Sequence, residues 1–113
     1  YTLSLHDALP ISGLVAGFCT NDADLIGRSM KDVIIEPIRS MLIPYFAEMK
    51  QTALDHNAIG FGISGSGPSV FALCKNKDEA EKIAIELHKL LYAQNISCES
   101  LVTKINNEGA VIL

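Results

Sequence analysis

The sequence predicts an α+β fold in which an antiparallel sheet carries helices on one face. From residue 12 to about residue 57, apolar residues recur every three or four positions, as on one side of a helix. Over residues 59–63 the period changes to two, which is typical of a strand. A glycine-rich loop, a second strand, a long helix and two short strands follow. This order, helices and then a β-loop-β-α-β-β unit, favours an α+β arrangement.

The first eleven residues, YTLSLHDALPI, differ from the rest of the chain. They show no helical or strand period that joins smoothly to residues 12–19, and they lack the charged start of a signal peptide. The segment is similar to a translated sequencing-adaptor read. We therefore expect residues 1–11 to be non-native or disordered, and residues 12–113 to be one domain of a protein whose N-terminal part is missing. The alternative is a genuine but irregular N-terminal arm.

Two helices are predicted in the next part of the chain. Residues 13–19 are apolar and small, as expected for the end of a buried helix. Thr20 and Asn21 can cap a second helix, because their side-chain oxygens can accept hydrogen bonds from its first amides. Apolar residues at helical spacing extend this second helix to about Ile35.

Two prolines open the next helices. Pro37 suits the first turn of a short helix over residues 37–42, since proline needs no backbone donor there. Pro44 repeats this device and opens a longer amphipathic helix. Asn57 is suited to ending that helix in the left-handed conformation.

A strand, a loop and a second strand come next. Residues 59–63 alternate bulky side chains with glycines, so this strand has one bulky and one bare face. A bare glycine face lets another backbone or a ligand approach closely. Residues 64–68 form the loop, and residues 70–74 the second strand.

The last third of the chain is predicted to hold one helix and two strands. Asn76, with Glu79 three residues later, resembles a capping box at the start of the longest helix. That helix ends near Gln94. Residues 97–105 then read as a third strand and residues 110–113 as a last short strand.

The composition excludes several classes of protein. The chain has 113 residues, enough for one compact domain, and its 49% hydrophobic residues exclude intrinsic disorder. Nine Lys and Arg against 13 Asp and Glu give a net charge of −4, which argues against nucleic acid as a partner. No apolar run approaches the ~20 residues that a transmembrane helix needs, so a membrane is not expected as a partner either.

The cysteines and histidines indicate no metal site and no disulfide framework. Cys19, Cys74 and Cys98 form no C-x-x-C pair and are odd in number, and the three histidines are scattered. The chain is therefore expected to be cytoplasmic, with reduced thiols and no metal ligands of its own.

Residues 60–73, GFGISGSGPSVFAL, carry most of the chemical information. A dinucleotide fingerprint would need a helix directly after its glycines, and a Walker A loop would need a following Lys. Neither is present. The loop instead offers backbone N–H groups in a tight turn suited to an anion, and Ser64 and Ser66 add donors. A plain glycine-rich hairpin is the alternative that composition alone favours.

The segment SGSGPSVFAL, residues 64–73, resembles the third conserved motif of the GHMP kinases, a superfamily of small-molecule kinases. The stretch over residues 30–44 is similar to the homoserine kinases within that superfamily. Its D-x-I-x-E-P-x-R pattern is matched by five residues, namely Asp32, Ile34, Glu36, Pro37 and Arg39. The resemblance covers about residues 12–113.

This resemblance implies the ferredoxin-like C-terminal domain of a GHMP kinase. It implies that the full-length enzyme transfers the γ-phosphate of ATP, with Mg²⁺, to the hydroxyl of L-homoserine in threonine biosynthesis. Arg39 would hold the substrate carboxylate. The loop would close the site and support the phosphate loop of the N-terminal domain through four residues, Ser64, Gly65, Ser66 and Gly67. Such roles suit phosphoryl transfer, where positioning supplies much of the catalysis.

The chain departs from the family in extent, because the family's phosphate loop is absent. No catalytic base or Mg²⁺ ligand can be assigned, so the fragment alone is expected to be inactive and to bind neither ATP nor Mg²⁺ tightly. Asp32 and Glu36 are interpreted as helix-terminal charges. Whether the chain forms a homodimer stays open.

Three other functions remain open on the sequence. Another GHMP kinase specificity would keep the loop but need not keep Arg39. A non-catalytic ferredoxin-like module that binds an amino acid would bind its ligand without a partner domain. A dimerisation domain would explain the apolar helices but not the Gly-Ser loop.

Overall fold

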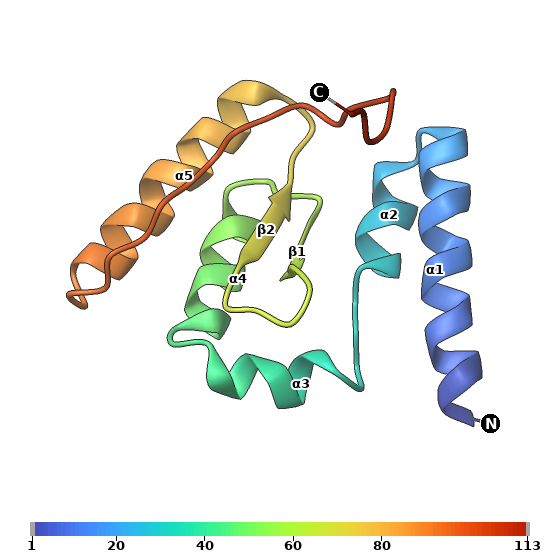
Figure 1. Cartoon of the computed structure of the whole chain (residues 1–113), viewed down its shortest axis with the longest axis horizontal. Coiled ribbons are helices and arrows are strands. Elements are labelled where there is room, and N and C mark those ends of the chain that lie inside the picture. The colour runs from blue at the N-terminus through green and yellow to red at the C-terminus, as the bar shows by residue number, and fades with distance from the viewer. Residues whose placement is uncertain (1, 113) are drawn as a thin grey trace.

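The computed structural model describes residues 2–112, with the side chains of residues 10–112. Helices precede and follow one β-hairpin, and the chain after the last helix folds back along it (Figure 1). The elements are α1 (Thr2–Thr20), α2 (Ala23–Ser29), α3 (Glu36–Arg39), the 3₁₀ helix η1 (Ser40–Leu42), α4 (Phe46–Asp55), β1 (Gly60–Ile63), β2 (Val70–Leu73) and α5 (Lys77–Tyr92).

The sheet formed by the described residues has two antiparallel strands. Gly60 of β1 lies opposite Leu73 of β2, and Gly62 lies opposite Phe71. The predicted α+β class, the antiparallel pairing and the order of loop, second strand and helix are confirmed. Because neighbours in register share a face, Phe61 and Ala72 lie together on one side of the sheet.

Helices α4 and α5 cover that bulky face. Phe61 is only 2% exposed, and its ring centroid lies 5.4 Å from that of Phe46 on α4. The buried core consists of Ile43, Phe46, Met49, Ala53, Phe61, Ile83 and Leu91. Its members come from the end of η1, α4, β1 and α5, so the hairpin is fixed to the two helices through one apolar cluster.

On the opposite face of the hairpin, Gly60 and Gly62 leave β1 without side chains, as the alternating glycines predict. A Cβ atom added to Gly60 would lie 2.3 Å from the sulfur of Met30, so that side chain occupies the space the missing methyl leaves. A Cβ atom on Gly62 would lie 3.2 Å from the ring of Phe71 on β2. This face is where the larger part of the candidate site lies.

The second helix is shorter than predicted and starts later. Asp22 caps it, accepting a hydrogen bond from the amide of Leu25 at 3.0 Å, whereas Asn21 adopts the left-handed conformation with φ 53°. The prediction that Thr20 and Asn21 cap this helix was wrong, because Thr20 still belongs to α1. The predicted extension to Ile35 was also wrong.

Local hydrogen bonds explain why α2 ends at Ser29 although apolar residues continue at helical spacing beyond it. The carboxylate of Asp32 accepts hydrogen bonds from the amides of Ile34 and Ile35, both at 2.8 Å. These bonds offer the backbone an alternative to helical pairing. The segment therefore turns, and α3 and η1 follow where one short helix over residues 37–42 is predicted.

Two predicted helix ends are confirmed. Asn57 has a φ of 70° after α4, which is the left-handed stop that the sequence indicates. The side chain of Asn76 accepts a hydrogen bond from the amide of Glu79 at 2.9 Å and so caps α5. In both cases the position of the helix end depends on residues within one helical turn of it.

The two C-terminal strands were predicted wrongly for the described part of the chain. Residues 97–105 and 110–112 form no strand there, and Leu113 lies outside the described residues. Figure 1 shows the first part of this C-terminal segment running back along α5. Cys98 and Ser100 contact His88 on α5, so alternating side chains meet a helix where pairing with the sheet was expected.

The structure continues α1 through residues 2–11, where the sequence shows no helical period. The packing of α1 on α2 depends on later residues. Cβ atoms on Gly13 and Gly17 would lie 2.2 Å from Ser29 Oγ and 2.6 Å from Ile26 Cγ1, so close approach of the two helices needs these glycines. No helix among the described residues is long and apolar enough to cross a membrane.

Removal of residues 1–11 should therefore leave the melting temperature unchanged within experimental error. The chain starting at Ser12 keeps Gly13 and Gly17, and so keeps these α1–α2 contacts. Thermal melts of the two chains measure the effect. A clear loss of stability after the deletion would show that residues 1–11 are native structure.

Candidate functional site

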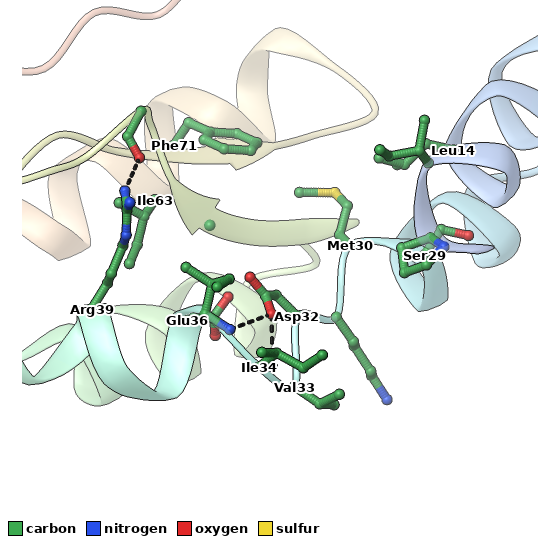
Figure 2. Close-up of a pocket in the computed structure, with 16 residues that line it drawn as sticks. Leu14, Ser29, Met30, Asp32, Val33, Ile34, Glu36, Arg39, Ile63 and Phe71 are labelled. Carbon is green, nitrogen blue, oxygen red and sulfur yellow. Dashed lines mark hydrogen bonds between the residues drawn. The ribbon is translucent and has the colours of Figure 1, made fainter. Parts of the chain in front are cut away.

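A cavity of about 580 Å³ opens on the bare face of the hairpin. Figure 2 shows α3 and the preceding turn on one side of it, the hairpin above, and the middle of α1 with the end of α2 opposite. Apolar side chains make up most of its wall, among them Leu14, Met30 and Phe71. The charged residues lining it are Lys31, Asp32, Glu36 and Arg39. All four come from the turn before α3 or from α3 itself.

Arg39 and the glycine-rich loop meet at the edge of this cavity. The Nη1 group of Arg39 donates a hydrogen bond to the carbonyl oxygen of Gly65 at 3.2 Å, across 26 residues of sequence (Figure 2). A guanidinium has five N–H donors, so this bond leaves others for a ligand. The structure thus brings together the two features that the sequence singled out. Their roles toward a substrate stay predictions.

The loop owes its shape to two left-handed glycines. Gly65 has a φ of 61° and Gly67 a φ of 80°, a backbone conformation that residues with a Cβ atom rarely adopt. The amide of Ser64 donates to the carbonyl of Ser69 at 2.8 Å, and that of Gly67 donates to the carbonyl of Ser64 at 3.2 Å. An anion bound by this loop would therefore be held by the amides of Gly65 and Ser66.

Glu36 is joined to α4 by an ion pair with Lys50. The exposed fractions of the Lys50 and Glu36 side chains are 29% and 12%, so this pair is largely shielded from water. A buried charge is costly without a partner, so the pair favours one placement of α3 on α4. Glu36 is helix-terminal, as interpreted from the sequence, but it is paired with Lys50 across the fold.

The charge of Asp32 is fixed by the backbone. Burial would raise its pKa, but hydrogen bonds from the amides of Ile35 and Ile34, together with the nearby charge of Lys50, hold its pKa below the usual value. The carboxylate is thus ionised at neutral pH and is engaged in holding the turn. Asp32 was interpreted as a helix-terminal charge, but it lies in the turn between α2 and α3, where its carboxylate binds the amides of that turn.

Sequence reasoning missed Lys50, Met30 and Phe71. Lys50 lies 14 residues from Glu36, on a helix whose polar positions are otherwise solvated, and no local pattern marks it. Met30 was interpreted as one apolar position of a longer helix.

The described residues contain no group of three or more His, Cys, Asp or Glu side chains placed to hold a metal ion.

Chemically, the cavity combines apolar walls with a guanidinium at its rim and an ionised carboxylate in its lining turn. A guanidinium binds a carboxylate or phosphate in a directional, bidentate manner. This combination suits a small molecule that carries an anionic group.

Three comparisons point to one group of proteins. The sequence profile described as "GHMP kinases C terminal" matches residues 14–93. A homoserine kinase from Chlorobium phaeobacteroides is 42% identical over 105 residues, which is 91% of this chain and 33% of that protein. A homoserine kinase from Xanthomonas campestris is 39% identical over 110 residues, covering 97% of this chain and 33% of that protein.

A solved structure agrees with these sequences. The crystal structure of homoserine kinase from Cytophaga hutchinsonii superposes with a TM-score of 0.87 at 45% identity, over 94% of this chain and 34% of that one. The chain therefore spans about a third of the length of the relatives it matches.

Proposed function

This chain belongs to the GHMP kinase family, and we propose that it is the C-terminal part of a homoserine kinase, which transfers the γ-phosphate of ATP to the hydroxyl of L-homoserine. The observation that carries the proposal is the contact of Arg39 with Gly65 at the rim of the cavity. It joins the helix of the E-P-x-R pattern to the glycine-rich loop. The three relatives named above are homoserine kinases by name, which supports this substrate over others in the family.

The role proposed for Arg39 follows from its geometry. Its side chain is exposed on α3 and keeps donors beyond the one that Gly65 accepts. A planar guanidinium can grip the carboxylate of an amino-acid substrate with two parallel hydrogen bonds. Fixing that end of homoserine would orient its side-chain hydroxyl, and positioning of this kind is a large part of catalysis in phosphoryl transfer.

ATP and Mg²⁺ are proposed for the whole enzyme only. The described residues do not fit MgATP by themselves, because the glycines of the loop are not followed by a Lys and no acidic group is assembled for a metal. No chemical step is therefore assigned to a residue of this chain. The loop, Ser64 to Gly67, is proposed to support the phosphate-binding loop of the other domain, and a role in threonine biosynthesis in the cytoplasm follows from the proposed reaction.

An amino-acid-binding module without catalysis is the second candidate. It would use the same cavity and the same Arg39, but it would bind its ligand without any other domain. Calorimetry with L-homoserine on the 113-residue chain separates the two. The kinase proposal predicts no tight binding by the chain alone, because two thirds of the relatives' length lies outside it.

Activity should appear only when the chain is completed. We define the joined enzyme as the Chlorobium phaeobacteroides homoserine kinase in which residues 12–113 of this chain replace the matching segment. ADP release coupled to a dehydrogenase should depend on homoserine in the joined enzyme. It should stay at background with the 113-residue chain or with the remaining part of the relative alone.

Two results would count against the proposal. Homoserine-dependent turnover by the 113-residue chain would show that this chain carries the catalytic groups. A folded joined enzyme that phosphorylates mevalonate or galactose in preference to homoserine would place the chain elsewhere in the GHMP family.

A further inference from the structure

Helix α3, which carries Arg39, is not held in place by apolar packing. None of its four described residues is buried, and Ile38 is 67% exposed. The 3₁₀ helix η1 that follows has no buried residue either, and the chain reaches the buried core at Ile43. The direction in which α3 presents Arg39 therefore depends on other contacts.

Two polar contacts tie α3 to distant parts of the described chain, one at each end of the helix. At its first residue, Glu36 forms the ion pair with Lys50 of α4. At its last residue, Arg39 donates to the carbonyl oxygen of Gly65 in the exposed loop. The second contact uses the guanidinium that is proposed to hold the substrate. The contact at Glu36 is thus the one that fixes α3 independently of Arg39.

Lys50 is suited to fixing α3 because its own helix is well anchored. Phe46, Met49 and Ala53 of α4 belong to the buried core, and Lys50 lies one turn after Phe46. The low exposure of both charged side chains means that water competes little for either group. The ion pair therefore joins a helix fixed by the core to a helix that has no apolar anchor.

Loss of Lys50 would change the placement of Arg39. The carboxylate of Glu36 would stay shielded from water without a partner, which is unfavourable for a charged group. It can regain water if the start of α3 moves outward, and no buried side chain of α3 opposes that movement. Arg39 lies three residues after Glu36, less than one helical turn away, so it would move with the helix.

We propose that Lys50 is a positioning residue of the candidate site. By holding Glu36 it fixes α3, so that Arg39 meets both the loop and the carboxylate of the substrate. Lys50 is not among the residues that line the site cavity, and it acts on the substrate through α3 alone. The identity of the substrate, homoserine, rests on the proposed function. The alternative is an ion pair that stabilises the fold without any selective effect on the site.

Substrate selectivity separates these two roles in the joined enzyme. In Lys50→Met, kcat/KM for homoserine should fall by at least about tenfold, the lower end of the effect of losing one hydrogen bond to a charged group. The value for L-homoserinol, which has no carboxylate, should change little, and so should the KM for ATP. In an Arg39→Met background, Lys50→Met should cause no further loss, because both changes remove one interaction.

Lys77→Met is the matched control for the loss of a lysine ion pair. Lys77 pairs with Glu81 on the surface of α5, where both side chains are at least half exposed. This variant should keep the kinetic constants of the parent for both substrates.

Limited proteolysis measures the placement of α3 without any substrate. Trypsin cleaves after Arg39 only when the segment leaves the fold, so the early cleavage rate reports local opening. Cleavage after Lys89 on α5, a helix that contributes Ile83 and Leu91 to the core, reports opening of the core. In the 113-residue chain, Lys50→Met and Glu36→Met should each raise the ratio of the first rate to the second by at least about tenfold. Lys77→Met should leave the ratio unchanged.

Three results would overturn the proposal. One is a kcat/KM in Lys50→Met that is unchanged for homoserine or that falls equally for homoserinol. Another is a double variant in which the losses from Arg39→Met and Lys50→Met multiply. The third is a cleavage ratio that stays at the parent's value in folded Lys50→Met and Glu36→Met. A joined enzyme that does not use homoserine would contradict the proposed function instead, and the cleavage ratio would still decide whether Lys50 places Arg39.

Discussion

Replacing Arg39 with Lys in the joined enzyme should lower kcat/KM for homoserine by about ten- to a hundredfold, the equivalent of one hydrogen bond to a charged group. A lysine ammonium keeps the charge but cannot offer the planar pair of donors that a carboxylate accepts. It also cannot both reach Gly65 and hold the substrate in the way that a guanidinium with five donors can. The KM for ATP should not change, because ATP is proposed to bind the other domain.

Steady-state kinetics with homoserine and ATP varied in turn measure both effects. Arg28→Lys is the matched control. Arg28 lies on α2 in an exposed i,i+4 ion pair with Asp24, and it is not among the residues that line the candidate site. Its replacement should leave both constants within error. A fall of the same size in both variants would mean that arginine as such, rather than its place on α3, is required.

Phe61→Ala should be the most destabilising single change in the hairpin. Phe61 is 2% exposed and packs against Phe46 at the centre of the buried cluster. Truncating a buried phenylalanine to alanine costs about 3–5 kcal/mol, because apolar contacts are lost and a cavity remains. For a chain of this size that corresponds to a melting temperature lower by roughly 10–20 °C.

Phe71→Ala is the control for this change. Phe71 is in the neighbouring strand but is 46% exposed and faces the candidate site, so its loss removes fewer contacts. Thermal melts of both variants by circular dichroism give the comparison. Equal losses in the two variants would contradict the assignment of Phe61 and Phe71 to opposite faces of the hairpin.

Elements decided by neighbouring residues could be predicted from the sequence. The caps at Asn57 and Asn76 depend on the backbone within one turn, and the two faces of β1 follow directly from its alternating glycines. The end of α2 could not be found in this way. Its apolar period continues past Ser29, and only the capture of two amides by Asp32 ends the helix.

Contacts between distant segments were the harder part. The alternating pattern of residues 97–105 is that of a strand, but their alternate side chains meet His88 on α5 in the described structure. In the candidate site, Arg39 and the loop were identified by their resemblance to a family. The contact between Arg39 and the loop, and the ion pair that joins Glu36 to Lys50, could be identified only in the folded structure.

Two roles are combined in Arg39, and a change in rate alone does not separate them. It holds the carbonyl of Gly65, and it is proposed to bind the carboxylate of homoserine. A substitution could therefore act through the loop without any contact to the substrate. A substrate analogue that lacks the carboxylate separates the two, because only the second role depends on that group.

The most direct measurement compares L-homoserine with L-homoserinol, in which a hydroxymethyl group replaces the carboxylate, in the joined enzyme and its Arg39→Met variant. If Arg39 binds the carboxylate, kcat/KM for homoserine falls by at least about tenfold in the variant while that for homoserinol changes little, so the preference for homoserine is largely lost. If both substrates lose the same factor, Arg39 acts through the loop alone, and its proposed role in holding homoserine is wrong.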